Sequence, residues 1–217
     1  MSMERQGGAG RLLGRHEITE LLDELGRRLD QRGVQAEMFL VGGGAMALAY
    51  STRRTTRDLD AVFQPKSVIY EEARRMAEDR GLPTDWLNDG VKGFLPDRPD
   101  SGEQVTYTSR GISLVIASPE YLFAMKGAAA RQEVDTDDLI ALAHLLGITT
   151  AHEALGLIER FYDRSRLTAK TQFVIEALFD SAEFTDDRIS EDLPSSGRVR
   201  GYTKGDGTVV RPHRRGH

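Results

Sequence analysis

Three consecutive glycines are the first feature of the sequence with chemical potential. Gly42, Gly43 and Gly44 follow the short apolar run 37–41 and open a stretch of helix-forming residues, 44–50. A glycine turn between a strand and a helix lets backbone N–H groups approach an anion, and the helix N-terminus adds a favourable dipole. A tight turn without a ligand would use the same residues. The turn lacks the G-x-G-x-x-G spacing of dinucleotide-binding proteins, and no Gly-Lys-Ser/Thr follows it as in a P-loop.

Two aspartates stand at the start of the next apolar run, 59–63. Asp58 and Asp60 flank Leu59, and alternate residues of a strand point to the same side. Both carboxylates are therefore expected to face one way, with Leu59 in the core. Such a pair suits Mg²⁺, which proteins hold with few carboxylates plus substrate phosphates. A solvated strand end would explain the pair alone, but together with the glycine turn it predicts a phosphate and metal site. The metals would activate an attacking hydroxyl and stabilise a leaving pyrophosphate.

A longer pattern joins these two features. In chain order it reads Gly43-Gly44, then Arg54-x-Thr56-x-Asp58-x-Asp60. This order resembles the signature of the nucleotidyltransferase (polymerase β-like) superfamily. The segment 118–148 has a lysine on one helix and an Asp-x-x-Asp opening the next, and it resembles the AbiEii/MenT-type toxin branch and its uncharacterised relatives. The resemblance covers about residues 35–150.

The resemblance implies roles for individual residues. The implied catalytic group is Asp58, Asp60, Lys126 and Asp138, with Asp58 and Asp60 as ligands of Mg²⁺, or of Mn²⁺ in its place, and Lys126 as a triphosphate contact. The implied nucleotide contacts are Gly42, Gly43, Gly44, Ser51, Arg54, Thr56 and Asp135. The segment 82–94 is also similar to a recurring segment of the relatives, and we assign it no chemistry.

The activity implied by the resemblance is Mg²⁺-dependent transfer of a nucleoside monophosphate from an NTP such as ATP to an acceptor hydroxyl. By resemblance the acceptor is a tRNA 3′ end or another RNA, in a toxin–antitoxin or phage-defence setting with an antitoxin protein as partner. A small-molecule or protein acceptor is the enzymatic alternative.

One departure from the family pattern concerns the catalytic base. Many nucleotidyltransferases place a third carboxylate on a later core strand, whereas the runs 104–109 and 112–117 hold none. The base is therefore unassigned, and Asp135, Asp137 or Asp138 could replace it from the helical side. The same gap supports a second hypothesis, a non-catalytic nucleotidyltransferase-like binding or regulatory module that acts as a sensor or antitoxin.

Three of the singled-out residues have structural alternatives. Lys126 lies in a largely apolar helix, so its charge either reaches solvent or pairs with a phosphate or carboxylate. Asp135 could cap the next helix, where Asp138 would complement the dipole. Trp86 is more simply a core anchor than a stacking platform for a base.

The elements that position these residues follow from hydrophobic periodicity, caps and turns. Strands are expected over 37–41, 59–63, 104–109 and 112–117, the last two as a hairpin, and helices over 16–32, 44–50, 66–80, 119 onward, 135–147, 150 onward and 168–179. This order predicts an α+β fold: a nucleotidyltransferase-type core with a small mixed sheet, followed by a C-terminal helical subdomain. The expected division is a core with its N-terminal helix over 1–117, a helical subdomain over 118–180, and an acidic linker with a basic, flexible tail over 181–217.

Charge and composition restrict the setting of the 217-residue chain. Its net charge of −5 argues against a general nucleic-acid binder, but the segment 197–217 has six basic residues against one acid and the rest sums to −10. The basic segment 197–217 would solubilise the protein, bind nucleic-acid phosphates, or pair with the acidic remainder of the chain. Arg53, Arg54 and Arg57 would steer phosphates or form a solvated face. The absence of cysteine excludes thiolate chemistry, and with no apolar run of membrane-spanning length it suggests a cytoplasmic protein.

Overall fold

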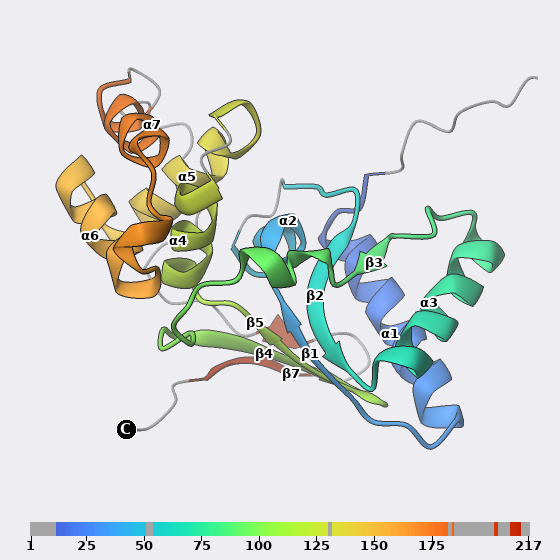
Figure 1. Ribbon diagram of the computed structural model, residues 1–217. Helices are drawn as coiled ribbons and strands as arrows, with labels where there is room; N and C mark the ends of the chain where they lie inside the picture. Colours follow the sequence, from blue (N-terminus) through green and yellow to red (C-terminus); the bar gives the residue numbers. More distant parts are fainter. Residues whose placement is uncertain are drawn as a thin grey trace, which may run out of the picture.

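A mixed β-sheet lies at the centre of the molecule (Figure 1). The computed structural model describes residues 12–50, 54–129, 132–181, 184, 202–203 and 209–213, and only the backbone of 132–135, 202–203 and 209–213. The strands are β1 (Ala36–Leu40), β2 (Leu59–Gln64), β3 (Leu87–Asn88), β4 (Gln104–Ser109), β5 (Ile112–Ile116), β6 (Tyr202–Thr203) and β7 (Val209–His213).

The strand order is β3-β2-β1-β5-β4-β7-β6. Strand β1 pairs antiparallel with β2 and parallel with β5, and β4 and β5 form the expected hairpin. The short β3 runs parallel to β2 and places Asn88 beside Asp60. The ends of β1, β2 and β3 therefore meet, which brings the glycine turn and the aspartate pair together.

The helices are α1 (Arg15–Gln31), α2 (Gly42–Ala45), the π-helical η1 (Met46–Tyr50), α3 (Lys66–Arg80), the 3₁₀ turns η2 (Gly90–Phe94) and η3 (Arg164–Arg166), α4 (Pro119–Ala129), α5 (Gln132–Leu146), α6 (Ala151–Phe161) and α7 (Ala169–Phe179). Figure 1 shows α1 and α3 side by side along the sheet, and α4 to α7 gathered in a separate bundle. The α+β fold predicted from the sequence is confirmed.

Helix α1 packs through one apolar stripe. Its leucines and Ile18 recur at spacings of three and four residues and are fully or almost fully buried. Burying such a side chain contributes about 1.5–3 kcal/mol. Trp86 is also fully buried, and its Nε1–H donates to the carbonyl oxygen of Ala73, 2.9 Å away. The indole therefore anchors the chain between α3 and β3 and is not a stacking platform.

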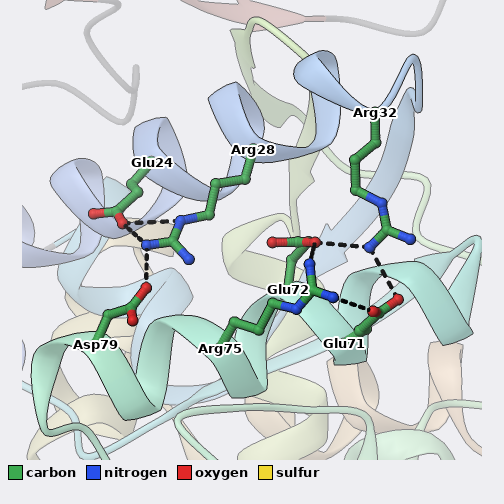
Figure 2. Close-up of polar contacts among 7 residues, drawn as sticks. All are labelled: Glu24, Arg28, Arg32, Glu71, Glu72, Arg75 and Asp79. Atoms are coloured by element: carbon green, nitrogen blue, oxygen red, sulfur yellow. Dashed lines mark hydrogen bonds and ion pairs between the residues drawn. The ribbon is translucent and has the colours of Figure 1, made fainter.

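Charged side chains connect α1 with α3 along their outer edges (Figure 2). Arg28 bonds to Glu24 on its own helix and to Asp79 on α3, at 3.0 and 2.7 Å. Further along, Arg32, the C-cap residue of α1, and Arg75 of α3 share the carboxylates of Glu71 and Glu72. We call these seven residues the α1–α3 network.

Caps and a close contact define the helical bundle. Ser118 caps α4, accepting from the N–H of Tyr121 and donating to Asp100. Thr150 and Glu153 form the predicted capping box of α6. A Cβ on Gly127 would lie 2.6 Å from Ile158 Cδ1, so glycine is needed where α4 crosses α6.

Three local expectations need correction. Helix α5 begins at Gln132, so Asp135 lies within it and is not its N-cap. The helix expected over 44–50 is π-helical from Met46 onward. The tail expected to be flexible contributes β7, which pairs antiparallel with β4 because that strand would otherwise end the sheet with unpaired backbone groups. The rest of the segment 197–217, apart from β6, lies outside the described residues.

Within the described ranges, no single helix is long and apolar enough to cross a membrane. Two consecutive helical segments, Thr136–Leu146 and Ala151–Phe161, reach the length and apolar composition of a membrane span only when they are taken together, and the chain bends by 94° between them.

Candidate active site

A cavity of about 660 Å³ opens where the sheet meets the helical bundle. Its walls come from the glycine turn, the segment leading into β2, η2, and the facing sides of α4 and α5. This volume lies within the range of about 300–1,000 Å³ typical of small-molecule sites.

The glycine turn packs directly against the residues of the aspartate segment. Gly42 has a φ of +64°, a conformation that favours glycine, and a Cβ there would lie 2.9 Å from Asp60 Oδ2. A Cβ on Gly43 would lie 2.7 Å from Thr56 Oγ1. Gly44 differs, because it packs against Leu59 and does not line the cavity. Two of the three glycines therefore keep the turn open toward the cavity, and the third permits core packing.

The two aspartates reach the cavity as strand alternation predicts. Leu59 is fully buried, whereas Asp58 and Asp60 both line the cavity. Asn88 Nδ2 donates to Asp58 Oδ2 at 3.1 Å. Burial raises the pKa of Asp58 and the nearby charge of Asp85 adds to the rise, while the hydrogen bond from Asn88 opposes it. A cation beside Asp58 would favour its ionised form.

This pair fits a magnesium ion that is shared with a substrate. Among the described residues, no group of three or more His, Cys, Asp and Glu side chains could hold a metal. Mg²⁺ is commonly held by one or two carboxylates, with phosphate oxygens and water completing its six ligands. Asp58 and Asp60 therefore suit a metal that arrives with a phosphate.

A buried ion-pair cluster forms another part of the wall. Lys126 Nζ lies 2.7 Å from Asp138 Oδ2, and Arg54 Nε lies 2.9 Å from Asp138 Oδ1. Only 9% of Lys126 and 3% of Asp138 are exposed. We call these three residues the cavity cluster. Its two cations and one carboxylate carry a net charge of +1, which favours an anionic ligand.

Hydrogen bonds hold the segment that follows Arg54. Leu13 and Thr56 exchange two backbone hydrogen bonds, at 2.7 and 3.0 Å. The Thr56 hydroxyl donates to the carbonyl oxygen of Asp58 at 3.0 Å. These bonds hold the chain between Arg54 and Asp58 in one conformation, so Asp58 enters the cavity from a fixed backbone.

Most of the residues selected from the sequence meet in this cavity. Its lining includes Gly42, Gly43, Arg54, Thr56, Asp58, Asp60, Lys126 and Asp138. Arg57 also lines it and is exposed. Ser51 and Arg53 lie outside the described residues, and only the backbone of Asp135 is described. Asp137 is exposed, 3.9 Å from Arg54.

Sequence reasoning missed two residues of the site, both in the segment 82–94. Asn88 contacts Asp58, and Phe94 stands in the cavity wall with 57% of its surface exposed. A polar residue beside the aspartate strand and an aromatic residue in a glycine-containing loop were the available signals. Neither signal reveals a contact without knowledge of how β3 pairs.

No protein-family model matches the chain, and no curated protein matches it significantly. Among solved structures, the chain is similar to an antigenic nucleotidyltransferase-like protein from Paracoccidioides brasiliensis. The similarity has 13% sequence identity and a TM-score of 0.43, and it covers 84% of this chain and 96% of that chain. A likeness at this TM-score does not assign the chain to a family.

Proposed function

We propose that the protein is an Mg²⁺-dependent nucleotidyltransferase that moves a nucleoside monophosphate from an NTP to an acceptor hydroxyl. One observation carries the proposal: a side-chain-free glycine turn, an aspartate pair and a buried cationic cluster line the same cavity. Phosphoryl transfer requires backbone groups that bind the phosphates, carboxylates that hold a metal ion, and fixed cations.

The glycine turn and the cavity cluster would bind the triphosphate. Gly42 and Gly43 present backbone without side chains, and Lys126 and Arg54 supply positive charge. Both oxygens of Asp138 lie beside these cations, so this carboxylate orients them. We therefore assign Asp138 a positioning role.

Asp58 and Asp60 would hold the metal against the phosphates. When bound, Mg²⁺ supplies charge neutralisation and aligns the attacking hydroxyl with the leaving pyrophosphate. Asn88 would fix the orientation of the Asp58 carboxylate through its 3.1 Å hydrogen bond. In the transfer, a bond forms between the acceptor oxygen and the α-phosphorus, the bond to pyrophosphate breaks, and the hydroxyl proton leaves to solvent or a carboxylate.

The resemblance of the sequence to AbiEii/MenT-type toxins supports a tRNA 3′ end as the acceptor, with an antitoxin protein as partner in the cytoplasm. The exposed Arg57 at the cavity is consistent with a phosphate-rich acceptor.

The direct test is transfer of label from α-³²P-labelled NTPs to total tRNA in the presence of Mg²⁺. We expect wild-type protein to label RNA, and Asp58→Ala and Asp60→Ala to reduce the rate by roughly 10²- to 10³-fold or more, because the metal contributes several kcal/mol. Asp30→Ala is the matched control, since Asp30 is exposed on α1 and does not line the cavity. Equal labelling by wild type and Asp60→Ala would contradict the proposal.

A second candidate is a non-catalytic nucleotide-binding module, favoured by one observation. The third carboxylate of the cavity lining, Asp138, is paired with Arg54 and Lys126, and the described residues form no group of three metal-type ligands. Calorimetry with ATP and Mg²⁺ distinguishes the two candidates. The binding module is supported over the enzyme if the wild type binds ATP, Asp60→Ala abolishes this binding, and no nucleotide is transferred to RNA, protein or small acceptors.

A further inference from the structure

The rim of the cavity exposes an unusual amount of apolar surface. Four large hydrophobic side chains are prominently exposed among the described residues, and two of them, Leu12 at 55% and Phe94 at 57%, line this cavity. The lining of the cavity also includes Val91, Leu122 and Met125. Large apolar residues exposed together at a concave surface indicate a binding site.

Phe94 is held in place although its ring is exposed. Its carbonyl oxygen accepts a hydrogen bond from the Tyr162 hydroxyl at 2.7 Å, and the next carbonyl, that of Leu95, accepts from Arg166 at 3.1 Å. At the other end of η2, Asp89 forms ion pairs with Lys66 and with Lys92. The backbone around the ring is therefore fixed from both sides, which limits the entropy lost when a ligand packs on it.

The cavity is thus lined by both polar and apolar groups. Gly42, Asp60 and Lys126 belong to its polar lining, and Phe94 and Leu12 to its apolar lining. A ligand that contacts both kinds of group must carry anionic groups and a flat apolar surface. Nucleotides have this combination, and bases stack on exposed aromatic rings.

We propose that Phe94 is a stacking platform for a nucleobase; this inference rests on the proposed function. The base belongs either to the donor NTP or to the terminal nucleotide of an RNA acceptor. In both cases the ring contacts the face of the base, so the platform favours nucleotides over base-free polyphosphates without selecting one base.

The experiment compares ligands that share phosphates but differ in the base. Binding of ATP, of inorganic tripolyphosphate and of the trinucleotide CCA is measured with Mg²⁺ for wild type, Phe94→Ala and Phe94→Trp. Base stacking predicts that Phe94→Ala weakens ATP or CCA binding roughly 5- to 150-fold and leaves tripolyphosphate unchanged. Loss for ATP assigns the platform to the donor, and loss for CCA alone assigns it to the acceptor. Phe173→Ala is the matched control, because Phe173 is 64% exposed and lies on α7 away from the cavity.

The Phe94→Trp variant gives an independent readout. The native chain has one tryptophan, and Trp86 is fully buried. A base that stacks on an indole at position 94 should therefore quench the fluorescence of that indole, and the Phe94→Trp variant should retain its affinity for the nucleotide. Tripolyphosphate, which has no base, should leave the fluorescence unchanged. Unchanged binding of both ATP and CCA to Phe94→Ala would overturn the platform alone. Wild type that binds neither ATP nor tripolyphosphate would overturn the proposed function, and the platform with it.

Discussion

Two ion-pair systems in this molecule use the same chemical groups in different surroundings. The α1–α3 network joins two helices, with Asp79 and Arg75 mostly exposed and the carboxylates of Glu24 and Glu72 mostly buried (Figure 2). In the cavity cluster, Lys126 and Asp138 are almost withdrawn from solvent and Arg54 is partly exposed, with Asp138 serving both cations. The network spreads its charges over seven residues, whereas the cluster depends on one carboxylate.

This difference separates stability from function. Exposed pairs contribute little because water and salt screen them. Removing one partner of a buried pair is expensive, because the remaining charge loses both solvent and partner. The cluster thus keeps two cations in a cavity wall although the loss of their carboxylate would be costly, and the proposed binding of phosphates would give those cations a role.

The largest expected effect is that of Asp138→Ala. The substitution leaves Lys126 buried without its carboxylate, and we expect a loss of about 3–5 kcal/mol in the free energy of unfolding, measured by urea denaturation. Asp138→Asn should lose less, since the amide oxygen still accepts a hydrogen bond. The double variant Lys126→Met, Asp138→Leu should recover much of the stability but not ATP binding. If the double variant binds ATP normally, the cluster is structural.

A smaller effect is expected from Arg28→Ala in the α1–α3 network. Arg28 contacts the exposed Asp79 and the mostly buried Glu24, which stays paired with Arg80 when Arg28 is removed, so the substitution should cost about 1 kcal/mol or less in the free energy of unfolding. The cost should shrink at high salt, whereas the cost of Asp138→Ala should hardly change. Arg28→Lys, which keeps the charge, is the control. A salt-independent loss at Arg28 would mean that the two systems do not differ as described.

The smallest effect concerns acid stability. Burial would raise the pKa of Glu24, but the hydrogen bonds and charges of Arg28 and Arg80 outweigh it and hold the pKa below its usual 4.5. A carboxylate with a lowered folded pKa stabilises the fold above its unfolded pKa, and the contribution disappears as the pH falls through the folded value. Unfolding curves recorded downward from neutral pH should therefore show a loss below about pH 4.5 that Glu24→Gln reduces. Parallel curves for the two proteins would exclude a role for Glu24.

Local sequence rules predicted most of the elements that surround the site. The spacing of the leucines in α1, the Thr150–Glu153 capping box and the alternation at Leu59 each depend on neighbours within a few residues. The meeting of the glycine turn with the aspartate pair was also predictable, because both flank consecutive strands. The domain division and the roles assigned to single residues stay predictions.

Contacts between distant segments could not be predicted in the same way. The pairing of Arg54 with Asp138 depends on how α5 packs against α4, and the hydrogen bond of Asn88 with Asp58 depends on the register of β3. Asp135 was misplaced as a cap because its type suits an N-cap, whereas the helix already begins at Gln132. Tertiary packing decides these cases, and one sequence contains no separate signal for it.

The pairing of Arg54 with Asp138 also sets an order of assembly during synthesis. These residues are 84 positions apart, so at about 5–20 residues per second they leave the ribosome roughly 4–17 s apart. The glycine turn and the aspartate pair emerge well before α5. The cavity cluster cannot be complete until that helix, which carries Asp138, has packed. Any fragment that ends before α5 would carry both cations of the cavity cluster, Arg54 and Lys126, without the carboxylate of Asp138 that pairs with them.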